Sequence, residues 1–261
     1  DGTSSTASYM GYLQYHHSDN HLRIGVNAAE RMRITSGGNV GIGTTSPATA
    51  LHVNSAGSGD KVKIGNGTRD AFFACDSSGV SLGNEASQAG ELLYLNQSSG
   101  YVSIFTNGGE RQKIDSSGNI TAPNQPSFFA YMSANFSIGV GSTKYTLDSV
   151  KHNTGSHYST STGKFTAPVA GKYLFLCNLA INNTGANPSY LSPGIRVNNS
   201  SIYYNGWDSK MSGTGYISNS NQIIIELSAN DYVEFYIELS TGVTGIGGEG
   251  YGCSFHGHLL S

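Results

Sequence analysis

The sequence predicts an all-β protein in which a β-rich shaft of repeated units precedes a β-sandwich head. Three observations support this fold class. First, the 261 residues include 35 glycines and 16 tyrosines, a composition typical of short strands joined by tight turns. Second, no window of ten or more residues has the periodicity of an amphipathic helix. Third, one segment in the first half of the chain recurs further along with the same apolar and turn positions.

The recurring segment defines the shaft. Glu30–Val40 aligns with Glu110–Ile120 at an offset of 80 residues, and each copy is predicted as strand, Gly-Asn turn and strand. A unit this thin buries little apolar surface alone, so we expect it to stack on neighbours or to wind with other chains. Residues 1–122 are therefore assigned to the shaft, residues 123–126, which contain two prolines, to a joint, and residues 127–261 to the head.

The central strand of the head is predicted within Gly163–Ile181. One face of it carries Tyr173, Phe175, Cys177, Leu179 and Ile181. The other carries Leu174, Leu176 and Ala180, with Asn178 as the polar exception. A strand with one wet face alternates apolar with polar residues, whereas a strand that is apolar on both faces is buried twice. Since no helix is expected to cover this strand, the second cover is most simply another copy of the chain.

Three further head strands follow from alternation. Gln222–Leu227 is a compact run rich in β-branched residues, and Tyr232–Leu239 alternates residues such as Glu234 with apolar ones. The closing segment Phe255–Leu260 alternates apolar residues and glycine with two histidines. Strong strands separated by Gly, Ser and Asn loops are typical of a β-sandwich.

Ordered motifs in the head resemble the C1q globular head, one of the C1q and tumour-necrosis-factor jelly rolls. They are TGKFTAPVAGKYLF in Thr162–Phe175, ANDYV in Ala229–Val233 and FHGHL in Phe255–Leu259. Asn230 stands where this family usually has Gly, and Asn tolerates the left-handed turn conformation. The resemblance implies a C1q/TNF-like jelly-roll head that assembles as a homotrimer.

The first repeat is similar to the repeat of bacteriophage tail fibres and side-fibre proteins. Asn27–Val53 carries ERMRI, then SGGNVGIGT, then SP and LHV, while the second copy, Asn107–Pro123, is shorter. The resemblance implies a trimeric β-rich fibre shaft in front of the head.

Composition excludes several classes of protein. Only 12% of residues are charged and the net charge is -3, so a basic nucleic-acid-binding surface is not expected. No apolar run reaches the roughly 18 residues needed to span a bilayer, and no signal peptide is visible, so membrane insertion is not expected. The chain begins at Asp1 without an initiator Met, which indicates a fragment of a longer protein. Of the three cysteines, Cys177 and Cys253 are expected as buried free thiols rather than as a bridge.

Two short strings match enzyme motifs, but neither has the context that the chemistry needs. Gly79–Gly83 matches G-x-S-x-G, whose nucleophile elbow requires a following helix. Gly245–Gly250 matches G-x-G-x-x-G, whose dinucleotide site requires a helix N-terminus. No helix is predicted after either string, so we expect no enzyme and no cofactor.

His256 and His258 are the candidates for a metal site, because both would point away from Phe255 on the last strand. On a three-fold axis, three copies would gather six imidazoles, enough for a divalent transition metal. Polar packing in a partly wet interface is the preferred interpretation. The other histidines show no ligand spacing in the sequence: His16, His17, His21, His52, His152 and His157.

A glycine-rich aromatic region supplies the candidate receptor-binding residues Trp207, Tyr216, Tyr204 and Asp208. Aromatic rings stack on sugar C–H groups, and neighbouring polar side chains bind hydroxyls. Tyr203 is expected instead in the core or an interface.

These features predict the receptor-binding end of a homotrimeric bacteriophage tail fibre. The protein would be made in the host cytoplasm and lie at the distal end of the fibre in the virion. It would join the rest of the fibre or the baseplate and adhere to a host surface receptor, most simply a glycan such as lipopolysaccharide. The alternative is a trimerisation clamp that folds the fibre without receptor contact. A capsule depolymerase would need clustered acids on a long β-helix, and a secreted C1q-type protein would not carry the fibre repeat.

Overall fold

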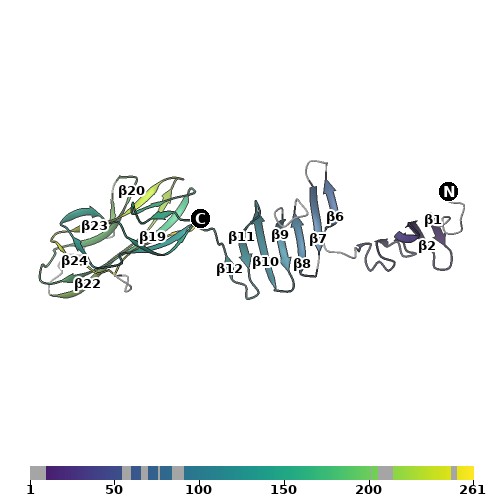
Figure 1. Cartoon of the computed structure of the whole chain (residues 1–261), viewed down its shortest axis with the longest axis horizontal. Coiled ribbons are helices and arrows are strands. Elements are labelled where there is room, and N and C mark those ends of the chain that lie inside the picture. Colours follow the sequence, from purple (N-terminus) through teal and green to yellow (C-terminus); the bar gives the residue numbers. More distant parts are fainter. Residues whose placement is uncertain are drawn as a thin grey trace. The chain divides into compact units, whose positions relative to one another are not determined.

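The computed structural model describes residues 10–54, 60–65, 70–75, 77–83, 91–200, 202–204, 214–247 and 252–261 (Figure 1). These residues form strands, turns and loops without a helix, so the all-β prediction is confirmed. None of the described segments is a helix long and apolar enough to cross a bilayer. The chain divides into two compact units, residues 1–123 and 124–261, which are called the shaft unit and the head unit below.

The shaft unit contains two sheets, and each follows chain order from strand to strand. The first has five strands: β1 (Gly11–His16), β2 (His21–Val26), β3 (Ala29–Ile34), β4 (Val40–Ile42) and β5 (Leu51–Val53). The second has seven: β6 (Asp60–Gly65), β7 (Asp70–Cys75), β8 (Gly79–Gly83), β9 (Glu91–Asn96), β10 (Tyr101–Thr106), β11 (Gly109–Ile114) and β12 (Ile120–Thr121). All neighbours are antiparallel except β4 and β5, which pair in parallel. Figure 1 shows β6 to β12 side by side in one layer.

The two sheets of the shaft unit share a four-strand unit. Strands β1 to β4 recur as β9 to β12 at the offset of 80 residues predicted from the sequence, so the repeat extends one strand further than its sequence signal. The pairing register shifts after Ile24 in the first copy and after Ile104 in the second. Asn27 and Asn107 both have left-handed backbone. The repeat is therefore identical in register as well as in strand order.

The head unit is a sandwich of two sheets. Sheet I runs β14-β24-β19-β25-β13-β16, with β22 also paired to β19, and sheet II runs β17-β18-β23-β20-β21, with β15 also paired to β23. The strands of sheet I are β13 (Ser127–Tyr131), β14 (Phe136–Ile138), β16 (Ser149–Thr154), β19 (Gly171–Asn183), β22 (Gly215–Leu227), β24 (Val243–Gly245) and β25 (Cys253–Leu259). Those of sheet II are β15 (Gly141–Lys144), β17 (Tyr158–Ser159), β18 (Lys164–Thr166), β20 (Leu191–Val197), β21 (Ile202–Tyr204) and β23 (Tyr232–Leu239).

An aromatic cluster fills the space between the two sheets. The ring of Phe128 lies 4.9 Å from each of the rings of Tyr158, Phe165 and Phe255. Aromatic side chains bury about 150–250 Å² each, so a cluster of this size dominates the stability of a small sandwich. Gly257 belongs to the same face, and a Cβ there would overlap the Phe128 ring. This close approach explains the glycine of the closing motif.

Strand β19 has the two faces that the sequence predicts. Residues from Tyr173 to Asn183 at odd positions are buried, and the even positions from Leu174 to Asn182 are half-buried. Cys177 and Cys253 are buried free thiols, as predicted. Asn230 has a φ of 72°, so it takes the left-handed turn conformation expected of it.

Strand β23 departs from the prediction of one polar face. Glu234 is buried, and its carboxylate accepts a hydrogen bond of 2.8 Å from the Lys144 ammonium on the neighbouring strand β15. Tyr236 is also buried, and its hydroxyl accepts a hydrogen bond of 3.0 Å from Arg196 on β20. The polar residues of this strand are covered because the cations of both adjacent strands lie over them.

Candidate functional site

The outer face of sheet I is the surface of the head unit that faces away from its core. On β19 it carries Leu174, Leu176, Asn178 and Ala180, all half-buried. On β22, Ile224 lies directly opposite Leu174 and is 58% exposed. An apolar patch of this kind on a sheet that already has a core on its other side is typical of an interaction surface.

Aromatic rings continue this face across β25, β13 and β16. The ring of His256 stacks on that of Phe129 at 3.9 Å, and Phe129 in turn meets His152 edge to face at 6.4 Å. The pKa of His256 is lowered, chiefly by burial and further by the charge of His152. Because the neutral ring is favoured, this part of the face is aromatic rather than cationic at neutral pH.

His256 and His258 lie on this outer face, whereas Phe255 points into the core. His256 is hydrogen-bonded to Ser254 Oγ at 3.0 Å. Within the described part of one chain, neither histidine belongs to a group of three metal-ligating side chains. A shared metal between copies stays a prediction.

A hollow of about 290 Å³ lies on the same sheet, between β19 and β22. Asn178, Ser218 and Ser220 line it with polar groups, and Gly252 closes one side. Its volume is at the lower end of the roughly 300–1,000 Å³ that ligand pockets occupy. The outer face of sheet I therefore combines an apolar region with a small polar one.

The first sheet of the shaft unit has one apolar face, built from cross-strand rows. Leu13, Ile24, Met32, Ile42 and Val53 lie opposite one another from β1 to β5. A second row consists of Tyr15, Leu22, Ile34, Val40 and Leu51. Residues paired in register point to the same face of a sheet. Many of these side chains are exposed, Leu13 to 71%.

The second sheet of the shaft unit repeats this arrangement. Its rows are Val62, Phe73, Leu82, Leu93 and Ile104, and Cys75, Val80, Leu95, Val102, Ile114 and Ile120. A hollow of about 390 Å³ on this face is lined in part by Val80, Leu95 and Val102.

The opposite faces of the shaft sheets bury polar groups instead. His21, Ser81 and Ser103 are buried, and Ser103 Oγ donates a 2.7 Å hydrogen bond to Glu110. Burial in the single chain is thus inverted: polar side chains cover one another while apolar rows face outward. Since apolar surface is what the hydrophobic effect removes from water, these rows are the surface that a partner would cover.

The receptor-binding residues predicted from the sequence fall on different elements. Tyr216 begins β22 and is 79% exposed, on the outer face of sheet I. Tyr204 lies on β21 of sheet II, where its hydroxyl meets Ser142 Oγ at 2.8 Å and burial raises its pKa to about 12. Tyr203 is 42% exposed, so the core position expected for it is wrong. Trp207 and Asp208 lie outside the described residues.

The motif Gly79–Gly83 lies wholly within strand β8. Ser81 is buried in the middle of that strand, and β8 leads toward β9 rather than into a helix. A nucleophile elbow needs an exposed serine on a sharp strand-to-helix turn, so the string has no catalytic geometry. The second string, Gly245–Gly250, lies partly outside the described residues.

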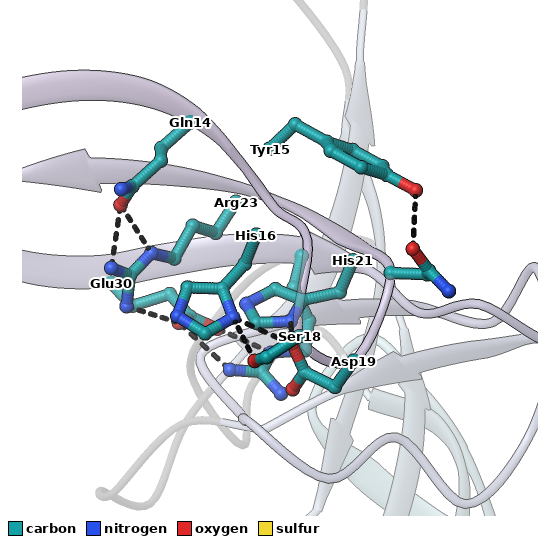
Figure 2. Close-up of polar contacts among 10 residues, drawn as sticks. Gln14, Tyr15, His16, Ser18, Asp19, His21, Arg23 and Glu30 are labelled. Carbon is teal, nitrogen blue, oxygen red and sulfur yellow. Dashed lines mark hydrogen bonds and ion pairs between the residues drawn. The ribbon is translucent and has the colours of Figure 1, made fainter.

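Sequence reasoning missed one cluster, at the turn between β1 and β2 (Figure 2). His16 and His21 are register partners across the hairpin, and both meet Asp19 in the turn. The signal was the string His-x-x-Asp-x-His, which gains meaning only once a four-residue turn places its two ends opposite each other. This group could hold a metal ion.

Residues 127–260 match the C1q domain family. A curated relative, complement C1q tumor necrosis factor-related protein 5 of Rattus norvegicus, is 24% identical over 39% of this chain and 44% of that protein. The chain thus spans less than half the length of this relative. Domains of the C1q and TNF type typically form homotrimers and are generally non-enzymatic.

Three solved structures are similar to about half of the chain. The globular domain of zebrafish complement 1qA is 16% identical with a TM-score of 0.39, over 52% of this chain and 98% of that one. Eiger TNF from S. frugiperda is 8% identical with a TM-score of 0.42, over 53% and 94%. Murine APRIL is 11% identical with a TM-score of 0.40, over 52% and 99%.

Proposed function

This chain belongs to the C1q domain family, and from that premise we propose that it is a homotrimeric attachment fibre. The observation that carries the proposal is that both units expose apolar sheet faces in the single chain. In the head unit the face includes Leu174 and Ile224, and in the shaft unit it includes whole cross-strand rows. A trimer that places these faces inward would cover both with one set of partners.

The tail-fibre identity rests on the sequence of the first repeat. Asn27–Val53 is similar to the repeat of bacteriophage tail fibres, and a one-layer sheet with an apolar face suits a shaft wound from three chains. In this proposal the protein belongs to the virion, joins the remaining fibre or baseplate through its shaft, and carries the head at the distal end. Low net charge limits non-specific adhesion.

The head would bind a glycan of the host surface, such as lipopolysaccharide. Tyr216 supports this proposal, because an exposed aromatic ring beside the polar hollow of β19 and β22 could stack on a sugar while serine and asparagine side chains bind hydroxyls. Three weak sites on one trimer would raise the overall affinity by avidity.

The test measures the mass of the full chain in solution together with its binding to bacterial cells and to purified lipopolysaccharides. We expect a trimer that binds some strains, with Tyr216→Ala weakening binding and Tyr203→Ala, an exposed tyrosine on sheet II, leaving it unchanged. A monomer, or equal loss in both variants, would contradict the proposal.

A second candidate function is a trimerisation clamp, favoured by the aromatic row of His256 and Phe129 on the outer face of sheet I. A third is a C1q-related protein with other partners, favoured by the rat relative. Both give a trimer that binds no bacterial surface. They differ in that removal of residues 124–261 would prevent trimer formation only if the head is the clamp.

A further inference from the structure

We propose that the turn between β1 and β2 is a binding site for a divalent first-row transition metal such as Zn²⁺. The site consists of His16, Asp19 and His21. Register pairing places the two histidines directly opposite each other at the end of the hairpin, and the turn between them carries the carboxylate. Hairpin geometry therefore gathers two imidazoles and one acid within six residues.

The potential ligand atoms converge on one point. Asp19 Oδ1 lies 2.7 Å from His16 Nδ1 and 2.8 Å from His21 Nδ1. One ligand atom from each of the three residues lies within 4.8 Å of the others. Figure 2 shows the two rings side by side with Asp19 and Ser18 beneath them, and the ring centroids are 5.0 Å apart. A shift of a fraction of an ångström would bring all three atoms to bonding distance of one ion, about 2.0–2.2 Å.

The donor types select the class of ion. Two imidazole nitrogens with one carboxylate oxygen suit Zn²⁺ and its first-row neighbours, whereas Ca²⁺ and Mg²⁺ prefer all-oxygen sites. Three protein ligands leave a fourth position to water or to another donor. Ser18 Oγ, 2.8 Å from His16 Nδ1, is the nearest further oxygen in the turn.

Burial of His21 is an independent observation that points to a ligand. Its side chain is only 7% exposed, yet Nε2 has no hydrogen-bond partner in the described part of the chain. The other ring nitrogen shares its acceptor, Asp19 Oδ1, with His16. Leaving a polar atom buried and unpaired costs about 1–3 kcal/mol. A metal–nitrogen bond would offset a cost that the hairpin alone does not recover.

Nearby cations are held by partners of their own. Arg23 donates to Gln14 Oε1 at 3.0 Å, and Arg33 donates to Glu30 Oε2 at 2.8 Å. Figure 2 shows Gln14, Arg23 and Glu30 linked in one chain of contacts beside the histidines. Because these guanidinium groups are engaged with one another's partners, they do not occupy the carboxylate of Asp19.

The second repeat shows that the turn does not need these residues in order to fold. Its equivalent positions, 80 residues on, are Asn96, Ser99 and Tyr101. There Asn96 Oδ1 accepts hydrogen bonds from the Ser99 backbone N–H at 2.7 Å and from Ser98 Oγ at 2.9 Å. The same hairpin register forms without a histidine or an acid. The donor set of the first turn is thus additional to the repeat, and in the bound state it would link edge strand β1 to β2.

The test uses the full chain, stripped of metal and titrated with Zn²⁺ in a calorimeter. The matched variant is the triple change His16→Asn, Asp19→Ser and His21→Tyr, which copies the second turn and so preserves the fold. We expect binding at one site per chain in the parent, at least about tenfold weaker binding in His21→Ala, and none at that site in the triple variant.

A second variant, His256→Asn with His258→Asn, separates this site from the head histidines. The proposal predicts unchanged Zn²⁺ binding there. It would be overturned by a parent chain that binds no Zn²⁺, or by a triple variant that binds as the parent does while retaining the parent's circular dichroism spectrum.

Discussion

The head unit and the shaft unit use the same alternation of side chains and complete their cores in opposite ways. In the head unit two sheets face each other, so aromatic residues such as Phe128 and Phe255 are fully buried within one chain. In the shaft unit each sheet is described as a single layer, and its apolar rows remain exposed while His21 and Ser103 are buried. The difference teaches that topology, rather than hydrophobicity, decides which unit is self-sufficient. Four experiments test this contrast.

The largest effect is expected from Phe128→Ala in the head unit. The ring contacts three other rings, so its removal leaves a cavity and should destabilise the head by about 3–5 kcal/mol. Chemical denaturation of the full chain, followed by near-ultraviolet circular dichroism, measures this change. A loss below about 1 kcal/mol would mean that the head is not held by its own core.

The next test compares two apolar side chains of equal exposure. Ile120 in the shaft unit is 63% exposed and Val140 in the head unit is 66% exposed in the single chain. Ile120 ends a cross-strand row, whereas Val140 lies in a turn. If copies cover the shaft rows, Ile120→Asp should remove about 1.5–3 kcal/mol of apolar burial per chain and reduce the trimer, while Val140→Asp should not.

Analytical ultracentrifugation measures the outcome. Equal behaviour of the two variants would break the comparison, because it would mean that the shaft rows stay in water as the single chain shows them.

A smaller effect is expected at the ion pair of the head unit. Lys144→Met leaves the buried carboxylate of Glu234 without its partner, at a cost of about 1–3 kcal/mol, since Lys144 is partly exposed. Adding Glu234→Gln should recover most of the loss in the same denaturation assay. A double variant no more stable than the single one would show that the charge is not what the lysine supports.

The smallest effect is a dependence on alkaline pH. Burial raises the pKa of Tyr204 to about 12, while the hydroxyl in an unfolded chain ionises near its ordinary value of about 10. Its stabilising contribution is complete below pH 10 and is lost as the pH rises toward 12, because the unfolded chain releases the proton first. Tyr204→Phe should flatten the fall in stability over this window. An unchanged slope would assign the fall to other groups.

Much of the head could be predicted because its signals are local. The double-faced strand β19, the left-handed Asn230 and the buried free thiols all follow from alternation and turn chemistry. The C1q domain was predicted over Ser127–Ser261 and is confirmed over residues 127–260.

The errors and omissions involve contacts between strands that are not adjacent in sequence. Glu234 was expected on a polar face, but Lys144, which is 90 residues away, covers it. His16 and His21 carried no recognisable ligand spacing, because the register that pairs them is a property of the hairpin. Strand alternation predicts which side a residue faces, and only pairing determines what it meets there.

The exact spacing of the two shaft repeats has a consequence for how such genes change in length. Strands, register shift and left-handed asparagine all recur after 80 residues, as Asn27 and Asn107 illustrate. Unequal crossing-over between the copies would delete or duplicate 80 codons in frame. Because a slip of one residue would turn every side chain to the opposite face, only an exchange between equivalent positions keeps the apolar rows aligned. The repeat thus allows inheritance to lengthen or shorten the protein in whole steps.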